Sequence, residues 1–85
     1  MNVLQNGLPI YVDFSNADAD GFVRLNCSGT LRDVAASGLS FFEGMEILVH
    51  DGEIQTTGTV RKANYEGAWL LEVNWREILE KHSKL

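Results

Sequence analysis

Apolar residues occupy every second position in two short segments in the first third of the chain. Residues 10–14 read IYVDF and residues 22–27 read FVRLNC, which puts Cys27 on the apolar side of its segment. A period of two with β-branched and aromatic residues is typical of a strand with one buried face. We predict two strands here, and the short loop between them predicts that they pair antiparallel.

The central part of the chain has the same period on both sides of a turn. Residues 45–50 and 53–60 flank Asp51 and Gly52. An aspartate followed by a glycine suits the positive φ angles of a tight two-residue turn, so these segments predict a β-hairpin. A glycine inside a strand is typical of a bulge or a sharp bend, which we predict at Gly58.

Aromatic and aliphatic residues also alternate from residue 68 to residue 75, after a predicted turn at 62–67. This alternation predicts a fifth strand, with Trp69 in the core. The spacing then changes to three and four residues, which predicts a short helix over 76–82. The residues that share one side at this spacing are Trp75, Ile78, Leu79 and His82.

Residues 31–37 have helical spacing as well. Thr30 precedes them, and Asp33 lies three residues further on, as in a capping box. Gly38 then allows the left-handed conformation that ends many helices. The pattern predicts a short helix that closes one end of the sheet.

Five predicted strands and two short helices make the chain mostly β. A length of 85 residues leaves room for one hydrophobic core, so residues 1–85 are predicted to form a single domain. Short strands with glycines at the bends are typical of a small five-stranded barrel or a coiled antiparallel sheet.

Residues 38–50, GLSFFEGMEILVH, are similar to a segment of SH3 domains. That segment reads roughly alanine or glutamate, leucine, serine, phenylalanine, two variable residues, glycine and aspartate, before an apolar strand. The matching positions are Leu39, Ser40, Phe41, Gly44 and Ile47. The resemblance implies an SH3-like topology. Met45 replaces the usual acidic residue, and the aromatic groove for proline-rich peptides has no counterpart, so no ligand-site residue is transferred.

The net charge of −5 comes from 12 acidic and 7 basic residues. Nucleic-acid binding draws on a basic stripe that neutralises phosphates, whereas here only Arg61 and Lys62 are adjacent cations. We therefore expect neither a nucleic-acid partner nor a membrane surface. A single cysteine excludes an intrachain disulfide, and the first ten residues have no signal-peptide pattern, so we expect a cytoplasmic protein.

The loop that begins at residue 16 resembles the first half of a calcium site. Asn16, Asp18 and Asp20 alternate and precede a glycine, as in a helix–loop–helix calcium loop. Arg24 and Cys27 then occupy positions where such a loop needs oxygen ligands. We favour a polar turn, in which these side chains bond to nearby amides. A weak metal site on Asn16, Asp18 and Asp20 is the alternative.

Few residues have a pattern that indicates catalysis. Cys27, His50 and His82 are not at zinc-site spacing, and no serine lies in a nucleophile motif. Asp18 and Asp20 would act as an acid–base pair only inside a cleft. We therefore expect no cofactor and no enzyme activity.

Several apolar residues lie off the main buried faces. Phe41 and Phe42 are adjacent, so an extended chain points only one of them to the core. Leu48 and Leu70 alternate out of phase with the core residues, and Glu46 adds a neighbouring acid. If Phe42, Leu48 and Leu70 share the outer surface, they form an apolar patch of the kind that marks a partner site. If the barrel curls over them, they are core residues instead.

These patterns predict a non-enzymatic interaction domain. It would bind a protein partner, or a second copy of itself as a homodimer, through Phe42, Leu48, Leu70 and Glu46. One alternative is an accessory protein that binds a metal or a small ligand through the Asp18/Asp20 loop. Another is a catalytic subunit whose active site is completed at an oligomer interface.

Overall fold

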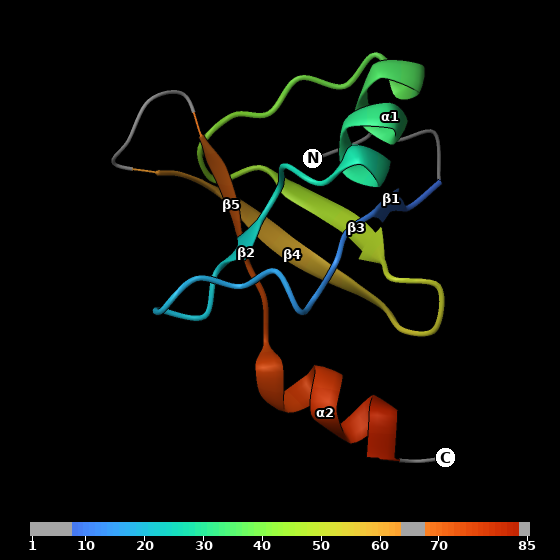
Figure 1. Cartoon of the computed structure of the whole chain (residues 1–85), viewed down its shortest axis with the longest axis vertical. Helices are drawn as coiled ribbons and strands as arrows, with labels where there is room; N and C mark the ends of the chain where they lie inside the picture. The colour runs from blue at the N-terminus through green and yellow to red at the C-terminus, as the bar shows by residue number, and fades with distance from the viewer. Residues whose placement is uncertain (1–7, 64–67, 84–85) are drawn as a thin grey trace.

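The computed structural model describes residues 8–63 and 68–83, with side chains as far as residue 80. The predicted turn at 62–67 therefore lies largely outside the described residues. The chain forms one curled five-stranded sheet and two short helices, so the mostly-β prediction is confirmed (Figure 1). In chain order the elements are β1 (Ile10–Tyr11), β2 (Val23–Arg24), α1 (Ser28–Ser37), β3 (Glu46–His50), β4 (Gln55–Lys62), β5 (Trp69–Glu72) and α2 (Trp75–Ser83).

The strands lie in the order β1-β3-β4-β5-β2. β3, β4 and β5 form an antiparallel meander, and β2 pairs antiparallel with β5. β1 pairs with β3 in parallel, so the sheet is mixed. The prediction that the first two strands pair with each other is wrong, because they occupy opposite edges. Besides its pairing with β5, β2 has a second antiparallel neighbour in the loop segment 16–18, through a bridge from Ala17 to Val23.

The buried side chains come from the alternating positions of the strands. The hairpin is confirmed, and its apolar positions Met45, Ile47 and Val49 are buried. The same cluster contains Ile10, Val12, Val23, Leu25, Leu39, Val60 and Leu71. Trp69, predicted in the core, is half-buried and packs against this cluster.

Gly58 makes a close strand-to-strand approach and not a bulge. It pairs with Ile47 in an uninterrupted register. A Cβ at this position would lie 2.7 Å from Cγ of Leu71. The glycine therefore leaves room for the buried Leu71 side chain, and the predicted bulge is wrong.

The loop of the hairpin has four residues instead of the predicted two, because His50 pairs with Gln55. Oδ1 of Asp51 accepts hydrogen bonds from the amides of Glu53 and Ile54, both at 2.9 Å. The aspartate thus organises a longer turn by bonding its own neighbours. Gly52 still adopts a positive φ of 101°.

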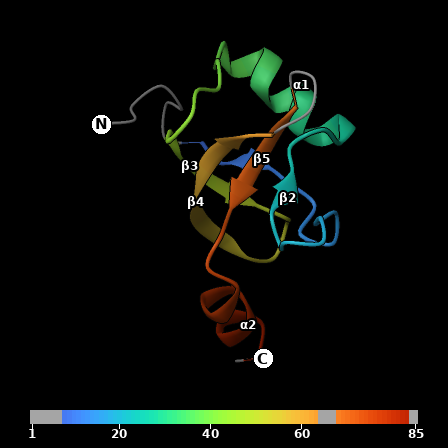
Figure 2. The ribbon, with the colours of Figure 1, turned by 90° about the vertical axis from the view of Figure 1, so that its left-hand side faces the viewer.

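Helix α1 covers one end of the sheet and lies beside β1, as both views of the ribbon show (Figures 1 and 2). It begins after Cys27 and ends at Gly38, whose φ of 72° confirms the predicted left-handed end. Thr30 is not the cap; it lies inside the helix and is fully buried. Its hydroxyl donates a 2.6 Å hydrogen bond to the carbonyl of Tyr11, so the buried polar group has a partner. Cys27, predicted in the core, is half-buried, with Sγ 3.1 Å from the Thr30 hydroxyl.

Helix α2 extends from the opposite end of the sheet (Figure 2). Its Trp75 indole donates a 2.7 Å hydrogen bond to the carbonyl of Gly21, and Thr56 donates one of 2.7 Å to Glu77. Ile78 is buried, whereas Leu79 is 63% exposed. The side chain of His82 lies outside the described residues. Neither described helix has the length and apolar character needed to cross a membrane.

Candidate functional site

The acidic loop uses its own oxygens to hold its turn. Oδ1 of Asp18 accepts hydrogen bonds from the amides of Asp20, at 2.9 Å, and Phe22, at 3.0 Å. The side-chain nitrogen of Asn16 donates a hydrogen bond to Oδ1 of Asn26, and Oδ1 of Asn16 accepts a 3.3 Å hydrogen bond from Arg24. Within the described residues, no three His, Cys, Asp or Glu side chains gather as metal ligands would. The hydrogen bonds of Asp18 are those of the predicted polar turn.

The predicted partner surface is only partly exposed. Phe42 is 51% exposed and Glu46 is exposed, whereas Leu48 is half-buried. Leu70 is 6% exposed, so its place in an outer patch is wrong. The three apolar residues therefore do not form a continuous exposed surface.

Leu70 is buried although its side chain faces away from the main core. Its direct cross-strand neighbours are Arg24 on β2 and Arg61 on β4. The long aliphatic parts of such arginines cover apolar surface while their charged ends stay in water. Strand alternation alone cannot reveal that Leu70 is buried, because its burial depends on which strands become neighbours.

Phe41 and Phe42 divide between core and solvent. The Phe41 ring packs against Trp69, with ring centroids 6.1 Å apart, so Phe42 is the exposed member of the pair. The next residue, Glu43, accepts hydrogen bonds from the Lys62 amide at 2.6 Å and from Arg61 at 3.0 Å. Both bonds lower the pKa of Glu43 below its ordinary value of 4.5, and the bond from the Lys62 amide has the larger effect.

Both outer edges of the sheet are covered in the part of the chain that the structure describes. At β1, the Tyr11 amide donates a 2.9 Å hydrogen bond to Oδ2 of Asp33, and Thr30 bonds to the Tyr11 carbonyl. At β2, the Arg24 amide donates to the carbonyl of Asn16 at 2.9 Å. A sheet whose edges are already bonded does not offer its backbone to another strand.

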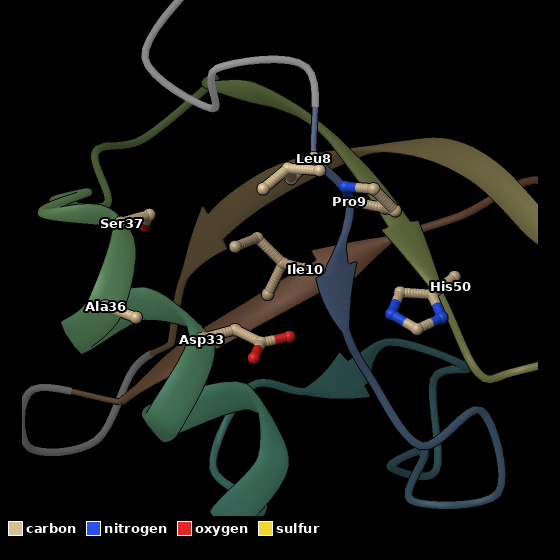
Figure 3. A pocket seen from close by; sticks show the side chains of 7 residues that line it. All are labelled: Leu8, Pro9, Ile10, Asp33, Ala36, Ser37 and His50. Carbon is tan, nitrogen blue, oxygen red and sulfur yellow. The ribbon is translucent and has the colours of Figure 1, made fainter.

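A hollow lined by α1, β1 and the end of β3 lies beside the hydrogen bonds that join α1 to β1. It consists of two adjoining pockets, which we call together the α1 groove. The first, of about 400 Å³, has an apolar wall and three polar side chains (Figure 3). Its lining residues are Leu8, Pro9, Ile10, Asp33, Ala36, Ser37 and His50.

The second pocket of the α1 groove is more polar and has a volume of about 500 Å³. It is lined by Tyr11, Ser28, Gly29, Arg32, Asp33 and His50. Asp33 and His50 therefore belong to both pockets, and they mark the place where the two hollows meet. Pockets of this size are typical of sites that hold a small ligand or a few side chains of a partner.

The polar groups of the groove are held in defined orientations. Nδ1 of His50 accepts a 3.1 Å hydrogen bond from the Gly52 amide, so the neutral ring carries its proton on Nε2. The same ring packs edge-on against Tyr11, with centroids 5.6 Å apart. The Asp33 carboxylate is oriented by its bond from the Tyr11 amide. The groove thus combines an anionic acceptor, an imidazole N–H donor and an apolar wall.

The sequence patterns did not identify this groove. Asp33 fitted a capping box, and His50 was the last residue of a predicted strand. The hydrogen bond from Tyr11 to Asp33 joins residues 22 positions apart, which only the packing of α1 on β1 brings together. The one available signal was that Thr30 and Asp33, three residues apart, share a face of a helix.

No family model, curated protein or solved structure matches the chain. Residues 38–50, which resemble an SH3 segment, run in the structure from the end of α1 to the end of β3. Gly44 has a φ of 87° immediately before the apolar strand. The SH3-like relationship stays a prediction.

Proposed function

We propose that this chain is a non-enzymatic, cytoplasmic protein-interaction domain that binds its partner in the α1 groove. The observation that carries the proposal is the meeting of two pockets at Asp33 and His50. These pockets lie between a helix and a strand edge, where a segment of another chain can reach both.

The covered sheet edges favour this mode of binding. Because side chains of α1 and the backbone of residues 16–18 already bond the two edges, a partner that adds a strand would have to break them. Binding through side chains in a hollow requires no such opening. The groove also offers both apolar contact and hydrogen-bonding groups, which together provide affinity and orientation.

Phe42, Leu48 and Glu46 remain a proposed second contact surface. Phe42 is the large exposed residue of this group, and it lies in the loop between α1 and β3. Its exposure fits either a partner or a second copy of this chain. The proposed SH3-like relationship concerns the topology alone and supplies no partner-binding residue.

A pair of tryptophan variants tests the α1 groove. Ala35 and Ala36 are adjacent, exposed residues of α1, but only Ala36 lines the first pocket. Ala36→Trp should fill the groove and Ala35→Trp should leave it open, while neither disturbs the core. We expect proteins captured from a cell lysate by the wild-type chain to be captured also by Ala35→Trp and lost with Ala36→Trp. Equal capture by both variants would show that the groove is not the site.

Light scattering over a concentration series tests self-association with the same variants. If the partner is a second copy bound through the groove, the wild-type chain and Ala35→Trp dimerise and Ala36→Trp does not. A dimer that persists in Ala36→Trp but is lost in Phe42→Ser would show that the two copies meet at the loop before β3.

A further inference from the structure

The geometry points to a lysine- or arginine-containing segment of a partner as the occupant of the α1 groove, with Asp33 as its counterion. This inference rests on the proposed function and adds the chemical class of the partner. It follows from the surroundings of one carboxylate.

Asp33 is a half-buried carboxylate that forms no ion pair with any basic side chain the structure describes. The ion pairs among the described residues join Arg61 to Glu43 and to Glu72, and Asp33 is in neither. One of its oxygens accepts the Tyr11 amide at 2.9 Å, which fixes the direction of the group. Figure 3 shows the carboxylate extending from α1 across the hollow toward β1. A bound cation would therefore meet a pre-oriented acceptor.

The remaining groups of the first pocket do not compete for a cation. His50 uses Nδ1 to accept the Gly52 amide, so only its N–H side is left to face a ligand. Arg32 lines the second pocket and not the first. Asp33 is thus the one anionic group of the first pocket.

The apolar wall suits the rest of a basic side chain. Leu8, Pro9, Ile10 and Ala36 line the first pocket around Asp33. Lysine and arginine carry an aliphatic stem that packs on apolar surface while the charged end reaches a polar partner. The pocket therefore complements the stem and the charge of one basic side chain together.

The net negative charge of the whole chain also favours a basic partner. A net charge of −5 attracts basic segments during encounter and repels acidic ones. We accordingly expect the affinity to fall as the salt concentration rises, because the attraction between charges is screened.

The test uses three acetylated and amidated tripeptides, leucine-X-leucine, in which X is lysine, glutamine or glutamate. Binding is followed by changes in the backbone amide signals of the ¹⁵N-labelled full chain. We expect the lysine peptide to shift the amides of Ile10, Ala36 and Ser37. We expect it to bind about tenfold more tightly than the glutamine peptide, and the glutamate peptide to bind most weakly.

Two variants that each remove one negative charge show whether the preference for lysine depends on Asp33. Asp33→Asn keeps an oxygen that accepts the Tyr11 amide and removes the charge, so an unchanged Tyr11 signal shows that the fold is kept. Asp20→Asn removes the same charge from an exposed position in the loop before β2. We expect Asp33→Asn to lose the roughly tenfold preference for lysine and Asp20→Asn to retain it.

Different results would overturn the basic-partner inference and the proposed function of the groove. If all three peptides shift the groove amides equally, or if Asp33→Asn retains the preference for lysine, the basic-partner inference is overturned and the groove remains a binding site. If no peptide shifts the groove amides at millimolar concentration, or if the shifts gather around Phe42, the proposed function is overturned as well.

Discussion

The two edges of the sheet are covered by different means. At β2 the backbone of residues 16–18 bonds directly to the strand. At β1 a helix covers the edge, and two of its side chains, Thr30 and Asp33, span the distance to the Tyr11 backbone. Neighbouring strands lie about 4.8 Å apart, whereas a helix packs farther from a strand. A helix that covers an edge therefore leaves room for a groove. The stability of this edge depends on the two side chains that bond to it.

The largest effect of a single substitution at these edges should come from Thr30→Val. The change keeps the shape of the side chain but removes the hydroxyl that bonds to the Tyr11 carbonyl. Because Thr30 is fully buried, the carbonyl would lose its partner where water has little access, which costs about 1–3 kcal/mol; we expect the free energy of unfolding to fall by that amount. Urea denaturation measures it. A change below about 0.5 kcal/mol would show that Thr30 does not secure this edge.

The next largest effect should come from Asp33→Ala, which removes the acceptor of the Tyr11 amide. Because the Asp33 side chain is half-buried, whereas Thr30 is fully buried, we expect a smaller loss of about 1 kcal/mol in the free energy of unfolding. Asp33→Asn is the control, since its amide oxygen can accept the same bond. A loss as large in Asp33→Asn as in Asp33→Ala would mean that charge, and not this hydrogen bond, stabilises the edge.

A smaller effect is expected at the β2 edge. Asn16→Ala removes the side-chain bonds to Arg24 and Asn26 but keeps the backbone bond from the Arg24 amide to residue 16. We expect about 0.5 kcal/mol of destabilisation by urea denaturation. A loss larger than that of Thr30→Val would reverse the comparison between the two edges.

The smallest effect is expected away from both edges, at the exposed Glu43. Hydrogen bonds from Lys62 and Arg61 lower its pKa in the folded chain, so its contribution to stability is present above pH 4.5 and is lost as the pH falls through the folded pKa. Glu43→Gln should therefore be slightly less stable than wild type at neutral pH. The difference should shrink as the pH falls below 4.5 and disappear below the folded pKa, in thermal melts at several pH values. A difference that grows on acidification would contradict this sign.

Local patterns predicted the elements better than the pairings. The alternation through Met45, Ile47 and Val49 predicted the central hairpin because a half-buried strand separates its two faces at every residue. The parallel pairing of Ile10 with Val49 joins positions far apart in the chain, and no local pattern encodes it. The same holds for Leu70, which is buried and whose cross-strand neighbours are arginines on two different strands.

The candidate site was harder to predict than the fold. The sequence leaves open which of Phe41 and Phe42 is exposed. Phe42 is the exposed one, but it has no continuous apolar surroundings among the residues of the predicted partner surface. The α1 groove joins β1, α1 and β3, and its shared residues Asp33 and His50 have ordinary local roles as well. Their proximity depends on a helix lying along a strand edge, which is a property of packing rather than of sequence period.

The central claim is that the hollow between α1 and β1 is a binding site. The most direct test is the affinity of the leucine-lysine-leucine peptide for Ala36→Trp and for Ala35→Trp, measured by amide signals of each labelled chain. Filling the groove at Ala36 should reduce the affinity at least about tenfold, whereas the neighbouring Ala35→Trp should bind as the wild type does. Equal affinity of the two variants would contradict the claim.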